Sequence, residues 1–342
     1  MRYAFSIALL VVLIGCGDKT AHSPEQLDTL AVTGALEPIA PRDTIRLRYA
    51  PTAGTVLVCS MRQDDAFDSD SLHGRTRTEL FFTETIERIA PTGHIELRMR
   101  YDSVTIEQRD WERDSSQAKT MRYRSTDSSS DDPRLEIFKA AIGEEIRATI
   151  APNGTVEEIS GVGAIVRKLL GSHADSLATE QRQIIDQELK SELYRYVLVQ
   201  QFLLLPDAPL DSSRAWTRTA EQEMSPVFAA STTARYRLQG IQRRGDDSLL
   251  VIAATLDGSI HLVPGAAKMP ITIRTGTVRG SASSILSRRH GVMLRRSNTS
   301  EYELMVEATD RRGVRQRARQ WKRSSSDFAV RWVRSTTGTG AR

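Results

Sequence analysis

The chain is 342 residues long and carries 47 Lys and Arg, 43 Asp and Glu, and two cysteines, which gives a formal net charge of +4. Two cysteines exclude a disulfide-rich fold, so the chain must be stabilised by burying apolar side chains, in one large domain or two similar lobes. The positive charge is local, because residues 311–342 contain ten Lys or Arg and one acid, Asp327. No nucleic-acid-binding motif accompanies these basic residues, so nucleic acid is excluded as the predicted partner.

The first residues have the three parts of an export signal. Arg2 supplies a positive charge, Ala4–Ile14 form an apolar run, and Gly15-Cys16 end it. At about 1.5 Å per residue, a helix of this run is too short to span a hydrocarbon core of about 30 Å. The run therefore predicts a signal peptide over residues 1–15 and not a transmembrane helix.

Leu13-Ile14-Gly15-Cys16 resembles the lipobox of bacterial lipoproteins. The resemblance implies that Cys16 receives a diacylglycerol and that residues 1–15 are removed. It also implies that acyl chains such as palmitate anchor the protein to a bacterial membrane, on the periplasmic or cell-surface face of the cell envelope. The alternative is an ordinary secretory signal with an incidental cysteine. If Cys16 is lipidated, Cys59 has no partner within the chain, and its apolar neighbours predict a small buried side chain.

Composition and periodicity divide the rest of the chain into segments. Residues 16–42 lack sustained periodicity and contain three prolines, which predicts a flexible tether after the lipid anchor. The predicted fold class is mainly β with a central helical segment (α+β): two similar antiparallel curved sheets, or half-barrels, packed with a helix over about 175–204. The predicted segments are a first β lobe (43–161), a helical connector (162–205), a second β lobe (206–334) and a disordered tail (335–342).

In the first lobe, short runs rich in Thr, Ile, Val, Phe and Tyr predict strands. Apolar and polar residues alternate in Ile95–Tyr101, as in a sheet with one wet face. Ala151-Pro152-Asn153-Gly154 is a turn signal between two further strands. The other predicted strands are Thr44–Tyr49, Thr55–Arg62, Arg75–Ile89 and His94–Gln108.

The connector is the only region predicted to be helical. Val162–Leu170 predicts a short helix, and Asp175 is a candidate N-cap for a longer one that ends before Pro206. Apolar residues recur near helical spacing from Leu177 to Phe202. Such a helix covers the open apolar face of a sheet, or binds a membrane or a partner.

The second lobe repeats the order of strand-like runs and turns of the first. Each lobe opens with an aromatic strand and ends near a Gly-centred hairpin, at Asn153-Gly154 and at His290-Gly291, which predicts a tandem duplication. Its predicted strands are Ala215–Glu223, Thr232–Gln242, Ser248–Leu256, Ile271–Arg279, Ser281–Leu286, Val292–Asn298, Ser300–Ala308, Val314–Lys322 and Phe328–Arg334.

Two segments, Leu47–Gly54 and Leu205–Trp216, are similar to parts of a loosely defined group of two-lobed, β-rich bacterial lipoproteins. The match departs from the pattern at Ser213, where glycine is expected, and at Arg214, where an acid is expected. The resemblance implies a β-rich lipoprotein of unassigned function. A more remote analogy is to periplasmic lipoprotein carriers, in which half-open barrels closed by helices hold acyl chains.

The sequence contains none of the common catalytic or metal-binding motifs, such as Gly-x-Ser-x-Gly, His-Glu-x-x-His or Cys-x-x-Cys. The acidic run from Asp64 to Asp70 offers oxygen atoms to Ca²⁺, but it fails the calcium-loop pattern at Leu72 and fits a solvated hairpin loop better. We therefore predict a protein that is not an enzyme and has no cofactor and no metal site.

Two groups of residues are candidate contact sites. Period-two spacing places Arg315, Arg317, Arg319 and Arg323 on one strand face, where guanidinium groups suit an anionic partner. The candidate ligand-lining residues are Trp216, Trp321 and Trp332, although aromatic residues in strands usually fill a core.

Two function hypotheses follow. The first is a membrane-anchored envelope lipoprotein that is not catalytic and binds a hydrophobic or amphiphilic ligand, such as a lipid, between sheet and helix. The alternative is a structural or interaction lipoprotein that presents the arginine strand to an anionic partner in the envelope, such as an envelope protein.

Overall fold

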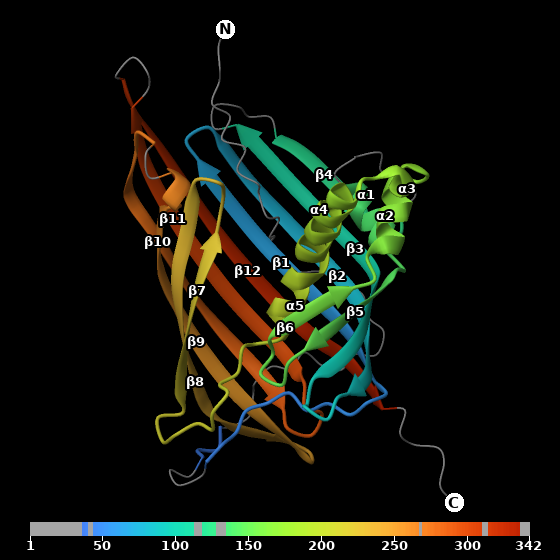
Figure 1. The fold of residues 1–342 in the computed structure, drawn as a ribbon. Coiled ribbons are helices and arrows are strands. Elements are labelled where there is room, and N and C mark those ends of the chain that lie inside the picture. The colour runs from blue at the N-terminus through green and yellow to red at the C-terminus, as the bar shows by residue number, and fades with distance from the viewer. Residues whose placement is uncertain are drawn as a thin grey trace, which may run out of the picture.

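The computed structural model describes residues 36–39, 44–112, 118–127, 135–266, 269–309 and 314–335. These residues form one antiparallel sheet of 12 strands that curls around a group of short helices (Figure 1). The signal peptide, Cys16, most of the predicted tether and residues 336–342 lie outside the described residues.

The strands before the helices and those after them form the two halves of this sheet. The spatial order is β6-β5-β3-β2-β1-β12-β11-β10-β9-β8-β7, with β4 paired to β3 outside this path. The strands are β1 (Thr55–Ser69), β2 (Leu72–Ile89), β3 (Ile95–Glu112), β4 (Ala118–Arg124), β5 (Glu145–Ile150), β6 (Val156–Ser160), β7 (Ala215–Glu223), β8 (Phe228–Arg244), β9 (Asp247–Leu262), β10 (Ile271–Ser287), β11 (Met293–Thr309) and β12 (Arg315–Ser335).

The sequence predicts a mainly β fold, which the structure confirms, but it also predicts two sheets, which the structure corrects to one. The halves merge because β1 and β12 pair along their whole common length, from Thr55 opposite Ser335 to Ser69 opposite Gln320. Each of β10, β11 and β12 also joins two runs that the sequence analysis separates. Serines in β12 look like loop residues, yet Ser324 Oγ donates a hydrogen bond to Asp65 across the sheet at 2.5 Å. The sheet thus supplies partners for polar residues inside the strand.

The helices are short and lie between the two halves of the sheet in the chain. The predicted helix over 175–204 is divided, and a π-helical turn separates its two α-helical parts. A helix also forms before β5, in a segment where the sequence predicts none. Among the described residues no helix is long and apolar enough to cross a membrane. The helical elements are α1 (Glu136–Ala141), α2 (Gly163–Leu170), α3 (His173–Ser176), α4 (Thr179–Leu189), η2 (π, Lys190–Arg195), α5 (Tyr196–Gln201) and the 3₁₀ turn η3 (Pro264–Ala266).

The helices pack against one face of the sheet, which we call the inner face. Tyr101 Oη of β3 donates a hydrogen bond to Leu193 O of η2, and the Tyr101 ring stacks on Tyr194 at 5.1 Å between centroids. Gln201 of α5 donates a hydrogen bond to Glu84 of β2 at 2.6 Å. The helices therefore bind the first half of the sheet through aromatic packing and buried polar contacts.

Apolar side chains fill the space between the helices and this half of the sheet. Alternate residues of β1, β2 and β3 point inward and are at most 6% exposed. Cys59 is one of them, so its predicted burial is confirmed, and burial raises the pKa of its thiol. Each large side chain buried in this way stabilises the fold by roughly 1.5–3 kcal/mol. The inward-pointing residues are Leu57, Cys59 and Met61, Leu80, Phe82 and Ile86, and Leu97, Met99 and Tyr101.

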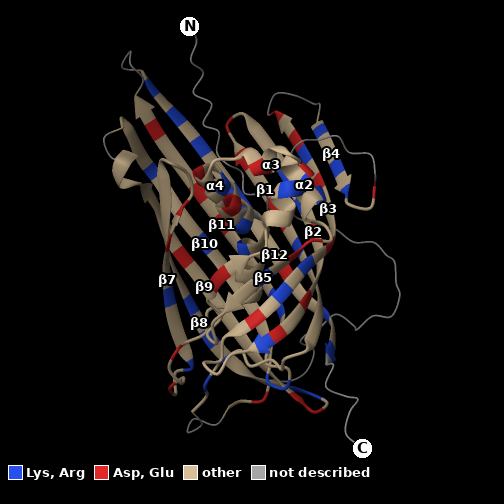
Figure 2. Ribbon diagram, turned by 45° about the vertical axis from the view of Figure 1, so that its right-hand side comes forward, with Lys and Arg blue, Asp and Glu red and all other residues tan. Residues whose placement is uncertain are grey.

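The opposite, outer face of the sheet carries ion pairs. Figure 2 marks acidic and basic residues interspersed along the strands. Arg295 Nη2 lies 3.0 Å from Asp327 Oδ2, and Arg235 Nη1 lies 2.8 Å from Asp257 Oδ2. Pairs of this exposed kind contribute little stability, typically less than about 1 kcal/mol. The outer face is therefore a solvated surface.

Candidate functional site

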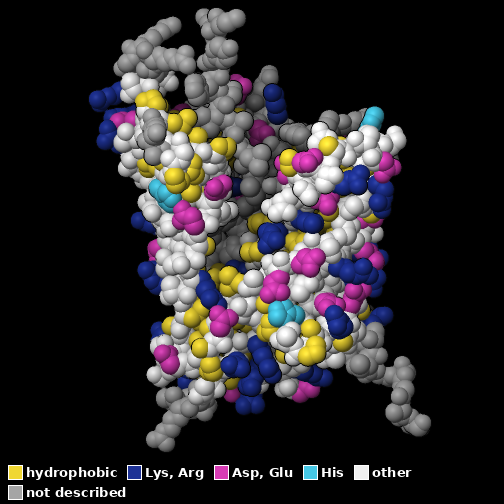
Figure 3. Space-filling model, in the orientation of Figure 1, with side chains coloured by type: hydrophobic (Ala, Val, Ile, Leu, Met, Phe, Trp, Pro, Cys, Tyr) yellow, Lys and Arg dark blue, Asp and Glu magenta, His cyan; other side chains and the backbone are white. Residues whose placement is uncertain are grey.

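The inner face continues across the second half of the sheet, where three neighbouring rows of side chains on β8, β9 and β10 are only half-buried. The register identifies this face: Ala282 lies opposite Asn298, and Asn298 Nδ2 donates a hydrogen bond to Gln200 Oε1 of α5 at 2.5 Å. The same row runs on through Ala254 of β9 to Tyr236 of β8. Figure 3 shows the molecule hollowed between this half of the sheet and the helical side.

We call this half-buried inner surface of β8, β9 and β10 the trough. Its side chains are apolar or small, in contrast to the charged outer face of the same strands. Pairing brings them together in three neighbouring rows. The rows are Thr232, Gly258 and Val278; Ala234, Leu256 and Gly280; and Tyr236, Ala254 and Ala282.

Two glycines give the trough its smooth floor. A Cβ at Gly258 would lie 2.5 Å from Ser231 O, and one at Gly280 would lie 2.5 Å from Thr299 O. No real side chain tolerates such contacts, so the backbones of neighbouring strands approach more closely here than any other residue permits. Glycine at these positions allows the tight packing of curled strands.

The two ends of the trough are apolar. At one end lies a separate cluster that includes Phe228, Ile260 and Leu304. At the other end Trp216 stacks on Tyr236 at 5.1 Å between ring centroids, and Trp216 Nε1 donates a hydrogen bond to Leu204 O at 3.2 Å. An apolar chain lying in the trough would therefore contact apolar groups along its length.

The wall of the trough toward the helices is polar and held firmly. Arg296 Nη1 donates hydrogen bonds to the carbonyls of Val199 (2.8 Å) and Gln200 (3.1 Å), which fixes the end of α5 against β11. Lys322 Nζ lies 2.9 Å from Asp65 Oδ2, in a pair of which neither side chain is more than 11% exposed. The charged residues of β7, β11 and β12 on the inner face are Arg218, Arg296 and Lys322, and each is basic.

Beneath α5 the buried carboxyl group of Glu84 is the most perturbed acid near the site. Burial raises its pKa from the ordinary value of 4.5 to about 7, although the hydrogen bond from Gln201 lowers it. Burial likewise raises the pKa of Tyr196, which lies beside Asp65, far above its ordinary value. The carboxyl group of Glu84 thus changes charge near neutral pH under the helix that lies beside the trough.

The structure keeps the candidate arginines together and separates the candidate tryptophans. The arginines of β12 lie together on the outer face, and two of them are paired: Arg317 Nε with Glu307 at 2.6 Å, and Arg319 Nη2 with Glu303 at 3.0 Å. Trp321 and Trp332 lie on the outer face as well, opposite Asp68 and Val58. Only Trp216 of the three tryptophans borders the trough. Arg315 and Arg323 are exposed at either end of the arginine row.

Sequence reasoning missed the small residues that form the trough. Ala234, Ala254 and Ala282 carry no chemical signature, and their alternation with polar residues predicts only a half-buried strand. Glycine inside a strand marks a bend or a close approach, but Gly258 follows the predicted strand Ser248–Leu256 and Gly280 falls between two predicted strands, so neither glycine gave this signal.

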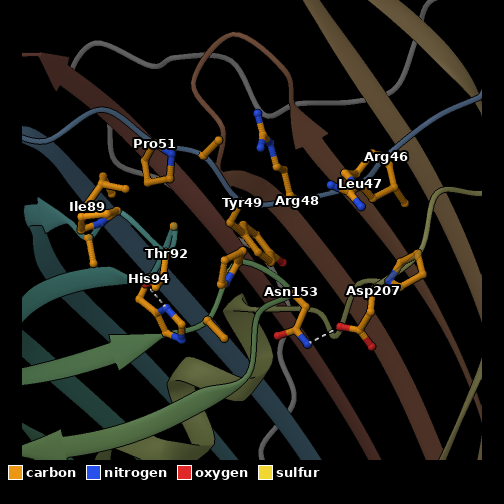
Figure 4. A pocket seen from close by; sticks show the side chains of 17 residues that line it. Arg46, Leu47, Arg48, Tyr49, Pro51, Ile89, Thr92, His94, Asn153 and Asp207 are labelled. Carbon is orange, nitrogen blue, oxygen red and sulfur yellow. Dashed lines mark hydrogen bonds between the residues drawn. The ribbon is translucent and has the colours of Figure 1, made fainter.

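A pocket of about 590 Å³ lies at the end of the sheet where residues 46–51 cross it (Figure 4). Apart from Arg46 and Arg48, its main polar side chains already have hydrogen-bond partners. Asn153 Nδ2 donates a hydrogen bond to Asp207 Oδ1 at 2.8 Å, which lowers the pKa of Asp207. His94 Nδ1 lies 2.6 Å from Thr92 Oγ1, and its Nε2 lies 3.2 Å from Glu157. We therefore regard the trough as the better candidate site.

Comparison with known proteins defines a family. The family model DUF6263, a family of unknown function, matches residues 92–278, and the chain belongs to this family. The match includes β5–β9 and the helices, and therefore most of the trough. No curated protein matches the chain.

Two solved structures give low similarity scores. A structure described as lipid–protein interactions in lipovitellin has a TM-score of 0.42 at 12% identity over 85% of this chain and 26% of that chain. The present chain thus spans about a quarter of that lipovitellin chain. OccK5 (OpdH) of Pseudomonas aeruginosa has a TM-score of 0.17 at 6% identity over 81% of this chain and 98% of that chain. Both TM-scores lie below 0.5.

Proposed function

We propose that this protein is a binding protein, without catalytic activity, that holds a hydrophobic or amphiphilic ligand in the trough. The observation that carries the proposal is the half-buried, apolar inner face of β8, β9 and β10, which lies beside a helix but is not packed like the first half of the sheet. An apolar ligand in this position would remove that surface from water, at about 25 cal/mol for each Å² covered.

The proposed ligand position differs from the one expected between sheet and helix. Beneath α5 and η2 the space is filled by Tyr101, Tyr194 and Phe82, so there is no room for an acyl chain there. The trough lies beside the helix instead, on the strands that follow it in sequence. We further propose, from the lipobox, that Cys16 is lipidated and anchors this protein to a membrane of the cell envelope.

The alternative function, display of the arginine strand to an anionic partner, is supported less well. Glu307 accepts hydrogen bonds from both Arg274 and Arg317, and Glu303 accepts one from Arg319. These arginines therefore already have anionic partners within the sheet.

Native mass spectrometry of the full chain, purified from the envelope in mild detergent, tests the proposed ligand. We expect the native mass to exceed the denatured mass, which includes any covalent lipid, by one apolar or amphiphilic molecule that is recovered by organic extraction. The Ala254→Phe variant should lose this excess mass, and Thr255→Phe, on the opposite face of β9, should retain it. Equal native and denatured masses for the wild type would contradict the proposal.

Metabolic labelling with an alkyne analogue of palmitate tests the anchor separately. Cys16→Ala should abolish labelling and release the protein from membranes, whereas Cys59→Ala should leave labelling unchanged. Label that persists in the Cys16→Ala variant would overturn the proposed anchor and leave the trough unaffected.

A further inference from the structure

The segment that crosses the end of the sheet brings arginines to a second pocket. Its backbone is fixed on both sides: Leu210 N donates a hydrogen bond to Ile45 O at 2.8 Å, and Ala50 N donates one to Gly291 O at 3.0 Å. Leu47 and Tyr49 point into the core, so the alternating residues Arg46 and Arg48 point away from it and are exposed.

Between this segment and the ends of β8, β9 and β10 lies a pocket of about 820 Å³, which we call the arginine pocket. Its charged lining residues are Arg46, Arg48 and Arg288, and its other polar side chains are the hydroxyls of Thr44 and Ser287. In Figure 3 basic side chains gather at the lower centre of the molecule, where this segment crosses. No carboxylate is among the described residues that line the pocket.

The charge of the arginine pocket is not neutralised as it is elsewhere on the molecule. Nearby, Arg243 Nε lies 3.0 Å from Glu37, and Arg289 pairs with Asp246. Within the described residues, by contrast, the guanidinium groups that line the arginine pocket form no ion pair. Like charges at one pocket repel one another, and an anion that binds between them relieves this repulsion. Arginine suits an oxyanion because its planar fork binds phosphate or carboxylate through two parallel hydrogen bonds.

The rest of the lining is apolar. Ile39, Leu250 and Leu286 are buried side chains that form its floor, and Ile45 and Ile241 are half-buried at its side. The volume falls within the range of small-molecule sites, about 300–1,000 Å³, and exceeds what a simple inorganic anion fills.

We propose that the arginine pocket binds the oxyanion group of an anionic amphiphile, with the apolar part of the ligand against the isoleucine side chains. This site is separate from the trough, because the buried residues Leu238 and Ile252 of the main core lie between them. It also accounts for three arginines that share one pocket with no acid among its described lining residues.

Isothermal titration of the full chain with dihexanoyl phosphatidylglycerol, below its micelle concentration, tests this site. We expect the wild type to bind this probe at least tenfold more tightly than dihexanoyl phosphatidylcholine or inorganic phosphate. The triple variant Arg46→Gln, Arg48→Gln, Arg288→Gln should lose at least tenfold in affinity. The matched control Arg235→Gln, Arg237→Gln, Arg279→Gln removes the same charge from the outer face and should stay within twofold of the wild type.

Two results would overturn the proposal. Equal affinity of the wild type and the triple variant for phosphatidylglycerol, with both variants folded by circular dichroism, would exclude the arginine pocket as the site. Inorganic phosphate binding as tightly as the phospholipid would exclude an amphiphile as the ligand class. Ala254→Phe should leave the phosphatidylglycerol affinity within twofold, which separates this site from the trough.

Discussion

The two halves of the sheet use the same face in different ways. In the first half, Phe82 of β2 is fully buried and packs edge-to-face on Tyr101 and against Phe328, at 6.3 Å between ring centroids in both cases. In the second half, Leu256 and Val278 on the same face remain half-buried, and their cross-strand partners are Gly280 and Gly258. The two halves differ in the size of their inward side chains, which are large in the first half and mostly small in the trough, and in the helices that cover the first half. One continuous antiparallel sheet can thus provide a packed core in one half and a binding surface in the other.

The largest expected difference between the halves is in stability. Phe82→Ala should destabilise the fold by about 3–5 kcal/mol, because it leaves a cavity in a packed core. Leu256→Ala in the trough should cost less than about 1.5 kcal/mol, because its side chain is already partly in contact with solvent. Urea denaturation of both variants measures this, and equal losses would show that the trough is packed as a core.

Glu84 tests how the helix is held on the first half. The pKa of Glu84 is about 7 in the folded protein and near 4.5 in the unfolded chain. Between these pH values the folded protein binds a proton that the unfolded chain has released. The free energy of unfolding therefore falls as pH rises from 4.5 to 7. Glu84→Gln should remove this loss, which is on the order of 3 kcal/mol. Thermal unfolding should therefore show that the stability of the variant relative to the wild type increases from pH 4.5 to pH 8. A stability difference that does not change with pH would contradict this.

Filling the trough should remove binding at little cost in stability. Ala254→Phe should weaken binding of the apolar fluorophore N-phenyl-1-naphthylamine at least tenfold, or by about 1.4 kcal/mol. Thr255→Phe adds the same ring to the exposed outer face of β9 and serves as the control. A fluorescence titration in which both variants bind as the wild type does would place the fluorophore elsewhere.

The smallest expected effect concerns the outer face. Arg319→Gln removes an ion pair with Glu303 in which the arginine side chain is 58% exposed. Because water and salt screen such a pair, the free energy of unfolding should fall by less than about 1 kcal/mol. A loss above 2 kcal/mol in urea denaturation would give the outer face a structural role that the geometry does not indicate.

Most strands were predictable from the sequence because alternation is local, but the predicted strand Thr44–Tyr49 forms only an isolated bridge at Ile45, and β4 was not predicted. The run Ala215–Glu223 matches β7, and the alternation in Ile95–Tyr101 lies within β3. The single sheet was not predictable, because it depends on pairing between β1 and β12, which are far apart in the chain.

The candidate site was harder to predict, and for a related reason. Arg317 and Arg319 share a face, as their spacing predicts, but only the register of β11 brings Glu307 and Glu303 beside them. Likewise, nothing local distinguishes Ala254 in an open trough from Ala148 in a packed core. Whether a helix covers an apolar face is decided by tertiary packing.

The most direct test of the central claim uses Trp216, which borders the trough, and Trp321, which lies on the outer face. Two full-length chains, each with the other three tryptophans replaced by phenylalanine, are titrated with a brominated fatty acid, which quenches tryptophan fluorescence on contact. An apolar ligand in the trough predicts saturable quenching of Trp216 and no such quenching of Trp321. Equal quenching of both tryptophans, or none of Trp216, would contradict a binding site on the inner face.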